Sequence, residues 1–549
     1  MRRSVIASVF LRSNALCVMA SACLAFGATA PARAGIPGGD STWITPLATP
    51  GNWADNVNWN PIAPTTARNA LIQTGVGATA NLGATAAAKT LFVDGNATLR
   101  SGTLTLDATA GNLWMNHGAR TILTLDASAV HGSVVVTTPT ATIGASDTAN
   151  GVDVGGYLET NVVNLATDGA GTATLTVVGD LNIGNDGSGN AVQGSPNGTS
   201  GTSAAVISAG SIKVSIAATA GAVDYNWIGT YGANDTLTAT NLQVGIAGDK
   251  GGAENFGGTW TVTNTIIGDQ AGSDGNYLTL REGTITNNGQ MVVGLGGSNN
   301  VLNVGDDVSG TFDMSASTSD LVIGSLAGAT GNGVSVNYGD LRVAKRIVVG
   351  DAGAMNYLEV GSIDSGSVTS GGIDVGRTSD GNTVSFDNGS TATIQGSVRL
   401  GDNGSNNSMF LRYNSVVTLT EPNKDFTIGY GSSVSSSGNR LDIRHAGSKL
   451  VMHAANSALW ISGATGGGGG TGNIAIVRDG GVLEVDNVIV ASGGTLAGNA
   501  SIVGTVSVAT GGMIAPGDGT AGSLGTLSVT GNVDFSPAVG GLGLLEIDI

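Results

Sequence analysis

Short runs in which apolar and polar residues alternate dominate the chain after its first 34 residues. In residues 97–99 and 103–106, for example, aliphatic residues alternate with threonine. Such runs end at glycine, asparagine or aspartate. Alternation with a period of two is typical of strands that bury one face, and glycine-rich punctuation is typical of turns. No helical periodicity of useful length follows residue 34. The pattern therefore predicts an all-β protein made of short strands.

The alternation belongs to a longer repeat between residues 242 and 452. An apolar residue precedes a glycine, a turn follows, and an asparagine then opens a run of the form Asn-x-apolar-x-apolar. The glycines from Gly245 to Gly429 are separated by 23, 26, 30, 26, 26, 25 and 28 residues, a period of ~26 that is typical of a solenoid. Residues 357–360, 367–368 and 373–375 are three strand-like pieces within one period. We therefore expect a parallel β-solenoid (β-helix) with ~26-residue coils of about three short strands each.

Two residue types recur at equivalent places in this repeat. Glycine is expected at corners, where the backbone needs a positive φ. Asparagine is expected to hydrogen-bond to the asparagines of the coils above and below, as stacked amides do in cross-β ladders. The predicted structural repeat positions are Gly268, Asn276, Gly294, Asn300, Gly324, Asn332, Gly350, Asn356, Gly376, Asn382, Gly401, Asn407, Gly429 and Asn439.

Residues 1–34 have the three parts of a secretory signal peptide. Arginines supply a positive beginning, residues 15–30 are apolar, and Ala32-Arg33-Ala34 is a small-x-small cleavage site. Both cysteines, Cys17 and Cys23, lie in this segment. The pattern predicts export by way of the signal peptide, to the cell surface, the outer membrane or the extracellular space, and a mature chain without disulfides.

The remaining chain is expected to form four further regions. Residues 35–70 contain Trp43, Trp53 and Trp59 among five prolines, and are interpreted as an N-terminal cap over the open end of the repeat, with stacking on sugar as the alternative. The other regions are irregular solenoid coils at 71–240, regular repeats at 241–455 and a C-terminal solenoid segment at 456–549. Residues 190–203 are interpreted as a loop inserted between coils.

Charge narrows the classes of partner. The whole chain has a formal net charge of −18, and without its first 34 residues 18 basic residues face 40 acidic ones. Such a chain repels nucleic acid and anionic membrane surfaces. No other apolar run approaches the ~20 residues of a membrane span, so no transmembrane helix is expected in the mature chain.

Catalytic chemistry has two candidate places. One joins Arg342, Lys345 and Arg346 to nearby acids, and the other lies in residues 440–449. Polysaccharide lyases and hydrolases group acids with a base, whereas a solvated outer face is the simpler interpretation. The full candidate set is Arg342, Lys345, Arg346, Asp340, Asp351, Asp442, Arg444, His445 and Lys449.

Metal binding has weaker sequence support. The four histidines His117, His131, His445 and His453 show no paired spacing suited to a metal. Turns rich in aspartate and glycine begin at Gly184, Gly268 and Gly401, but β-turn chemistry explains them more simply than calcium does. We therefore expect no metal site and no cofactor.

The repeat resembles a known family. The form apolar-x-apolar-Gly, turn, Asn-x-apolar-x-apolar is similar to the β-strand repeats of bacterial autotransporter passengers and related exported repeat proteins. Residues 492–546, which contain GGMIAPG, resemble the autotransporter-associated repeat near the end of such regions. Because an autotransporter continues into a translocator barrel, the resemblance implies that the C-terminal segment is truncated; release by another export route is the alternative.

Together these observations predict an exported structural or adhesive protein without catalytic activity. Surface glycans or other cell-surface proteins are the candidate partners, bound along ridges of Ser, Thr, Asn and Asp on a monomeric rod. The alternative is a carbohydrate-active or carbohydrate-binding β-helix protein. Acids from three neighbouring coils that converge with a basic residue around a groove would favour that alternative.

Overall fold

The computed structural model describes residues 41–44, 50–60, 62–72, 78–109, 111–116, 121–128, 130–145, 161–167, 171–185, 189–196, 203–216, 225–306, 308–431, 436–463, 469–517, 523–535 and 544–545. The chain divides into two compact units, Met1–Gly38 and Gly39–Ile549. The proposed signal peptide lies outside the described residues. The described residues contain no α-helix, only a 3-10 turn at Asn56–Asn58, and their strands join in one 46-stranded sheet.

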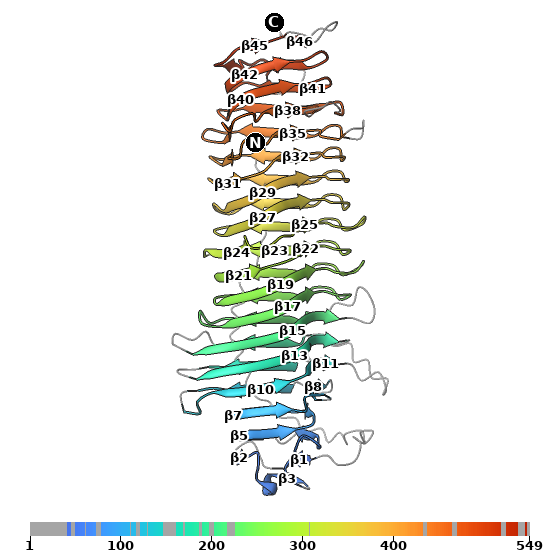
Figure 1. Ribbon diagram of the computed structural model, residues 1–549, viewed down its shortest axis with the longest axis vertical. Coiled ribbons are helices and arrows are strands. Elements are labelled where there is room, and N and C mark those ends of the chain that lie inside the picture. The colour runs from blue at the N-terminus through green and yellow to red at the C-terminus, as the bar shows by residue number, and fades with distance from the viewer. Residues whose placement is uncertain are drawn as a thin grey trace, which may run out of the picture. The chain divides into compact units, whose positions relative to one another are not determined.

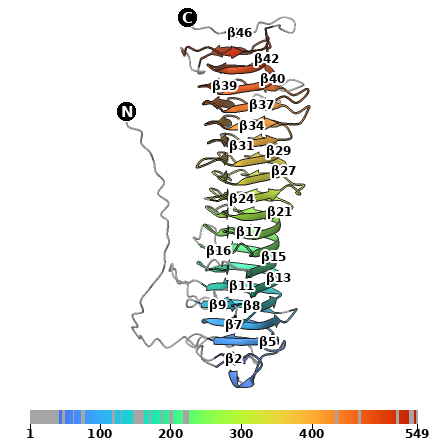
Figure 2. The same ribbon diagram turned by 90° about the vertical axis from the view of Figure 1, so that its left-hand side faces the viewer.

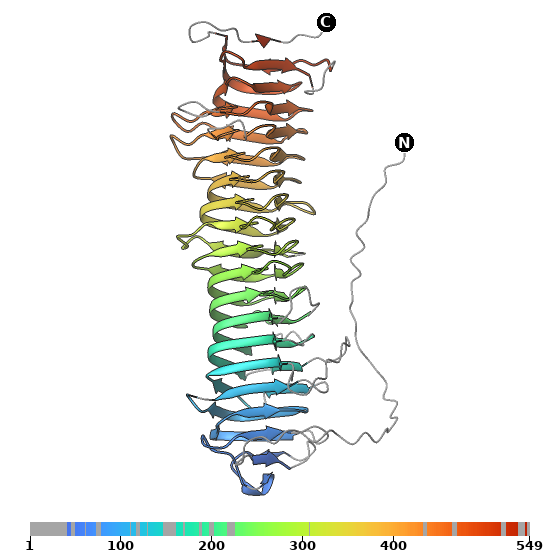
Figure 3. The same cartoon turned by 90° about the vertical axis from the view of Figure 1, so that its right-hand side faces the viewer.

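The strands fall into three series that the chain visits in a fixed order. We call these series the first, second and third faces, and one passage through them a tier. Each strand pairs in parallel with its equivalent in the next tier, as Leu278 pairs with Leu302 and Leu302 with Val334. Figure 1 shows the tiers in chain order from blue to red, and Figures 2 and 3 show this order from two other sides.

The first face follows the recurrent turn of each tier and contains most of the four-residue strands. Its strands are β2 (Gly51–Asn52), β9 (Thr121–Asp126), β12 (Asn161–Ala166), β14 (Ala191–Gly194), β16 (Trp227–Thr230), β18 (Gly252–Asn255), β20 (Tyr277–Leu280), β23 (Val301–Val304), β26 (Gly333–Val336), β28 (Tyr357–Val360), β30 (Thr383–Phe386), β33 (Ser408–Leu411), β36 (Arg440–Arg444), β39 (Asn473–Arg478), β41 (Gly494–Gly498), β43 (Met513–Pro516) and β46 (Leu544–Leu545).

The second and third faces complete each tier. Strands of the second face are β10 (Val134–Thr138), β21 (Gly283–Asn287), β24 (Gly310–Met314), β31 (Thr391–Ile394), β34 (Val416–Leu419), β37 (Lys449–Met452) and β44 (Ser528–Val529). Strands of the third face are β1 (Ser41–Trp43), β4 (Ala70–Ile72), β6 (Leu91–Val93), β8 (Asn112–Asn116), β11 (Thr140–Ala145), β22 (Met291–Val293), β25 (Leu321–Ile323), β32 (Val398–Leu400), β35 (Phe426–Ile428), β38 (Leu459–Ile461) and β45 (Val533–Asp534).

Some tiers merge two faces into one longer strand. In the pairing of β27 with β29 the register shifts between Val343 and Arg346, where the chain passes from the second to the third face. The first and second faces are joined in β5 (Ala78–Ala88) and β7 (Ala97–Leu106). The second and third faces are joined in β13 (Thr172–Asn185), β15 (Ala204–Ile216), β17 (Thr236–Val244), β19 (Thr259–Ile267), β27 (Asp340–Val349), β29 (Ser367–Val375), β40 (Val482–Val490) and β42 (Ser501–Val508).

The core is a set of aliphatic columns that run from tier to tier. In β28 the exposure alternates along the strand, so that Leu358 and Val360 are buried while their neighbours are partly exposed. Equivalent inward residues stack at the ~4.8 Å spacing of paired strands, which brings each apolar side chain into contact with the next. One such column, with no exposed surface at any member, is Leu278, Leu302, Val334, Leu358, Val384, Met409 and Leu441.

The N-terminal strands depart from this scheme. β3 (Trp59–Asn60) pairs antiparallel with β1. Trp43, Trp53 and Trp59 are at most 4% exposed, and the ring of Trp59 lies 4.9 Å from each of the other two ring centroids. The Trp59 indole N–H donates to the Trp53 carbonyl at 2.7 Å. These rings pack on one another, which leaves little of their faces open to a sugar.

The prediction of an all-β protein with parallel strands is confirmed, with one local correction. The sequence predicts an inserted loop at residues 190–203, yet Ala191–Gly194 is the first-face strand β14. It pairs in parallel with both β12 and β16. The reason is visible in the sequence, because Asn190 opens the same alternating run as the later asparagines do.

Candidate functional site

The asparagines of the repeat lie directly before or at the start of first-face strands and form a buried ladder. All seven are at most 1% exposed: Asn276, Asn300, Asn332, Asn356, Asn382, Asn407 and Asn439. The backbone N–H of Asn382 donates to Oδ1 of Asn407 at 2.9 Å, and its side-chain Nδ2 donates to the same oxygen at 2.9 Å. The other six repeat this double contact with the next tier. Each buried amide is thus satisfied by its neighbour.

The ladder extends beyond the region of regular sequence spacing. Asn161 donates to Asn190, and Asn190 to Asn226, at Nδ2–Oδ1 distances of 2.9 Å. At the C-terminal side Asn439 donates to Asn473. The ladder therefore extends past residues 241 and 455. Outside these residues the intervals between successive asparagines are longer, so the period of the sequence does not reveal them.

One tier replaces the asparagine with glycine. The backbone N–H of Gly251 donates to Oδ1 of Asn276 at 2.7 Å and so preserves the acceptor contact. A Cβ at residue 251 would lie 2.6 Å from the Ser215 hydroxyl oxygen. This oxygen accepts a hydrogen bond from Nδ2 of Asn226 at 3.4 Å. The serine hydroxyl therefore occupies part of the missing amide's place.

The repeat glycines face the ladder from the third-face side. They share φ values between +67° and +75° at Gly268, Gly294, Gly324, Gly350, Gly376, Gly401 and Gly429. A Cβ at any of them would lie 2.0–2.3 Å from a side-chain amide atom of the asparagine in the following tier. The expectation from sequence included the positive φ but missed this contact, because the spacing of a glycine and an asparagine in one tier does not reveal contact between tiers.

The residue immediately before each ladder asparagine is a second feature that was missed. Before the asparagines from Asn190 to Asn473 it has a positive φ even where it is not glycine, as in Tyr225, Asn299, Met355 and Asn406, and Lys250 before Gly251 has the same conformation. Elsewhere the position is glycine: Gly189, Gly275, Gly331, Gly381, Gly438 and Gly472. The recurrent dipeptide Gly-Asn is the sequence signal that identifies this position.

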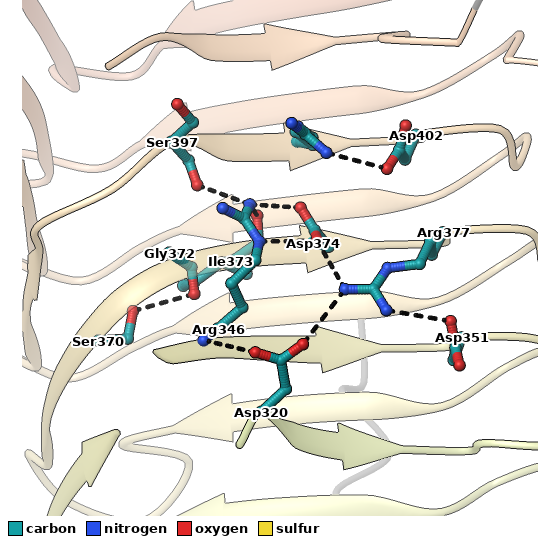
Figure 4. A network of polar contacts seen from close by, with 11 residues as sticks. Asp320, Arg346, Asp351, Ser370, Gly372, Ile373, Asp374, Arg377, Ser397 and Asp402 are labelled. Carbon is teal, nitrogen blue, oxygen red and sulfur yellow. Dashed lines mark hydrogen bonds and ion pairs between the residues drawn. The ribbon is translucent and has the colours of Figure 1, made fainter. Parts of the chain in front are cut away.

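A network of charged residues crosses the third face (Figure 4). The side chain of Asp374 in β29 is only 1% exposed. Arg346 from the preceding tier donates hydrogen bonds to both of its carboxylate oxygens. The Arg346 Nη2 also donates to the Ser397 carbonyl at 2.9 Å, and the Arg346 backbone N–H donates to Asp320 Oδ1 at 3.1 Å. One arginine therefore connects four consecutive tiers.

Arg377 brings together three acids, one of which lies two tiers away from the other two (Figure 4). Its guanidinium lies 3.5 Å from Asp320, 3.4 Å from Asp351 and 3.1 Å from Asp374. Burial alone would lower the pKa of Arg377, but its hydrogen bond with Asp374 and its ion pairs with Asp374, Asp351 and Asp320 together raise it. In the next tier, burial raises the pKa of Asp402 despite its contact with Arg399.

This convergence fulfils part of the condition set for an enzyme-like site. Acids from neighbouring tiers meet with basic residues alongside, but Asp320, Asp351 and Asp374 each accept contacts from an arginine. Proton transfer by a carboxylate needs an oxygen within reach of substrate, and Asp374 is almost fully covered. The arrangement is suited to holding tiers together, because each arginine contacts more than one of them.

The other predicted residues are spread over separate places. Asp340 pairs with Arg342 at 2.5 Å on the second face, and Lys345 is exposed. Burial alone would raise the pKa of Asp442, but hydrogen bonds from Arg478 and Arg440 outweigh burial and lower it. Three further members lie elsewhere around β36 and β37: Arg444 is half-buried, the His445 ring stacks on Tyr413 at 4.1 Å, and Lys449 lies 3.7 Å from Glu484.

His453 contacts two acidic residues, and the spacing of residues in the sequence did not reveal this. Its Nε2 lies 3.0 Å from Glu484 and its Nδ1 lies 3.0 Å from Asp486. Both acids come from the following tier. The hydrogen bonds with Glu484 and then Asp486 raise the pKa of His453. Of the other histidines, His131 lies 3.9 Å from Asp126, and His117 lies outside the described residues.

Within the described ranges, no group of three or more His, Cys, Asp or Glu residues is arranged to hold a metal ion. No helix in that same part of the chain is long and apolar enough to cross a membrane. Comparison with known proteins found no matching family, no matching curated protein and no matching solved structure.

Proposed function

We propose that this chain is an exported β-solenoid protein with a structural or adhesive role at a bacterial cell surface, similar to an autotransporter passenger. The observation that carries the proposal is the unbroken parallel pairing of tiers, from β4 with β6 to β43 with β46. A molecule built this way presents the same kind of surface many times over. Repeated weak contacts along such a surface bind by avidity without a deep pocket.

The charged residues support a structural role over a catalytic one. Arginines neutralise the buried carboxylates of Asp374, Asp387 and Asp442. Buried ion pairs of this kind restrict which tiers can lie next to each other, since a shifted register leaves a charge without its partner. The candidate ligands are surface glycans or other cell-surface proteins, bound without a cofactor.

Export is tested by expressing the chain in a Gram-negative host and treating intact cells with protease. We expect cleavage of the 34-residue leader and digestion of the chain on intact cells or its recovery from the medium. A matched variant in which Arg2 and Arg3 are replaced by glutamate should remain inside the cell, since the positive beginning of the leader is lost. A wild-type chain that stays full length and protected from protease contradicts the export proposal.

A second candidate is carbohydrate binding or cleavage, and one cluster on the first face favours it. The Tyr231 ring stacks on Phe256 at 4.4 Å, and Trp227 approaches Tyr231 edge-on at 6.1 Å. Arg281 lies 4.6 Å from the Phe256 ring centroid. Burial raises the pKa of the neighbouring Glu254. Aromatic faces beside a carboxyl group of raised pKa are features of carbohydrate sites.

This second candidate is tested by incubating the purified chain with neutral and acidic polysaccharides and measuring new reducing ends. Activity that Glu254→Gln abolishes would replace the adhesive proposal with an enzymatic one. Binding that is retained by Glu254→Gln, without new ends, supports a binding role. The absence of both removes the carbohydrate candidate.

A further inference from the structure

Two columns composed mainly of hydroxyl side chains run along the outer side of the second face. In each of seven successive tiers, from β7 to β21, two residues separated by one inward residue point outward. Pairing places them in register from tier to tier. One column is Thr103, Val135, Thr174, Val206, Thr236, Thr259 and Thr284, and the other is Thr105, Thr137, Thr176, Ser208, Thr238, Thr261 and Thr286. We call these fourteen residues the threonine array.

The array is specific to this face of the molecule. Threonine is favoured in strands generally, so β propensity alone would place it on all three faces. In the tiers of the array, the two first-face columns instead read Ile122, Val162, Ala191, Trp227, Gly252 and Tyr277, and Thr124, Asn164, Gln193, Gly229, Glu254 and Thr279. The third-face column of these tiers reads Trp114, Thr142, Asn182, Lys213, Gln243, Ile266 and Val292. A requirement of the second face itself is therefore the better explanation.

The hydroxyl groups of the array are available to a ligand. Among the hydrogen bonds of the described residues, none is made by a side chain of the array. Thr238, Thr259 and Thr261 are exposed. The array also contains no charged residue, although the chain has a net charge of −18. Charge returns only at its border, with Asp313 in β24 and the Asp340–Arg342 pair in β27.

The spacing of the array is that of a two-dimensional lattice. Paired strands set neighbours in a column ~4.8 Å apart, and two residues along a strand set the columns about 6.6 Å apart. Oxygen atoms on the faces of crystalline ice repeat at comparable distances. Each threonine offers a hydroxyl, which hydrogen-bonds water, and a methyl group, which limits the water's other orientations. Waters held by such an array are ordered in both directions.

We propose that the threonine array binds the surface of ice crystals. An uncharged, periodic ligand fits a face that has periodic hydroxyls and no charges, whereas a protein partner or an acidic polymer would be expected to use charged or irregular contacts. Each water contact is weak, and many of them act together because the array is rigid. This inference does not depend on export or on the adhesive role.

The test measures thermal hysteresis and the shape of single ice crystals in solutions of the purified full chain. We expect a gap between melting and freezing points and faceted crystals. Thr261→Lys and Thr238→Lys each insert a long charged side chain into the centre of the array and should abolish both effects. The matched control is Thr383→Lys, an outward residue of first-face strand β30, which should leave them unchanged. Circular dichroism melting curves verify that all variants fold.

Three results would overturn the proposal. The first is an absence of hysteresis and faceting in the wild-type chain. The second is full retention of both effects in the two array variants, once their folding is verified. The third is binding to microcrystalline cellulose or chitin that depends on the array while ice is unaffected, which would identify a crystalline polysaccharide as the ligand instead.

Discussion

Gly350 lies against the side-chain amide of Asn382, which belongs to the following tier. A Cβ on Gly350 would lie 2.3 Å from Cγ, Nδ2 and Oδ1 of Asn382. The same residue has a φ of +75°, a conformation that L-residues with a Cβ adopt at a cost. Glycine at residue 350 therefore both allows the positive φ and leaves room for the Asn382 amide. Mutation can separate these two effects.

Gly350→Ala is predicted to be more destabilising than a glycine substitution that meets only the backbone cost. Gly472→Ala is the matched control, because Gly472 has a φ of +70° and a Cβ added there would meet no heavy atom within 4 Å. Both variants incur about 1 kcal/mol from the positive φ. Gly350→Ala should add roughly 1–3 kcal/mol, since Asn382 must move away from its buried partners. Equal shifts in the thermal midpoints of the two variants would show that the contact with Asn382 contributes nothing.

Asn407→Ala is predicted to destabilise the ladder by leaving two donors of Asn382 without their acceptor. Buried donors without partners make this a loss of roughly 2–5 kcal/mol, measured by chemical unfolding. Asn407→Asp keeps an acceptor but buries a carboxylate beside Oδ1 of Asn439. Burial raises the pKa of such a group, so its defect should be largest at neutral pH and shrink in acid. A defect that does not change with pH would contradict this explanation.

Met355→Gly is predicted to stabilise the chain. Met355 has a φ of +57° and is 66% exposed, so its side chain contributes little burial to offset the unfavourable backbone conformation. Relief of that conformation should gain up to about 1 kcal/mol. Leu326→Gly is the control, since Leu326 is exposed to a similar extent, at 53%, but is not among the positive-φ residues. It should lose stability, and a loss in both variants would be evidence against strain at Met355.

His453 is predicted to contribute stability that depends on pH. The hydrogen bonds with Glu484 and Asp486 raise its pKa above 6.5 in the folded state. A raised histidine pKa means that the contribution is fully present below the unfolded pKa and is lost as pH rises through the folded pKa. His453→Gln should therefore be less stable than wild type at a pH of about 5.5 and equal to it at about 9. The difference should be small because His453 is 47% exposed. A gap of constant size across this range would rule out the titration.

Sequence reasoning identified the strands because their pattern is local. The alternation in residues 357–360 predicts β28 from within a single tier. The corner at Gly350 is predicted because glycine readily adopts a positive φ. Contacts between tiers are a different matter. Asp374 meets Arg346 across 28 positions, and His453 meets Glu484 across 31. These separations depend on turn lengths that vary from tier to tier, so spacing in the sequence could not identify the partners.

The limits of the ladder were missed for a related reason. Asn161, Asn190 and Asn226 carry the same hydrogen bonds as the later asparagines, but their intervals of 29 and 36 residues obscure the period. Gly251 removes the marker residue from one tier altogether, while the backbone contact to Asn276 persists. A search for the dipeptide Gly-Asn, independent of period, would have found Asn190 and Asn473.

The central structural claim is that the buried asparagines from Asn276 to Asn473 form one hydrogen-bonded ladder through successive tiers. Its most direct test is hydrogen–deuterium exchange resolved to single residues. The backbone amides of Asn300, Asn332, Asn382 and Asn407 donate to asparagine oxygens rather than to backbone carbonyls. We expect them to exchange as slowly as the strand amides that follow them. Exchange as fast as that of the exposed turn residues would contradict the ladder.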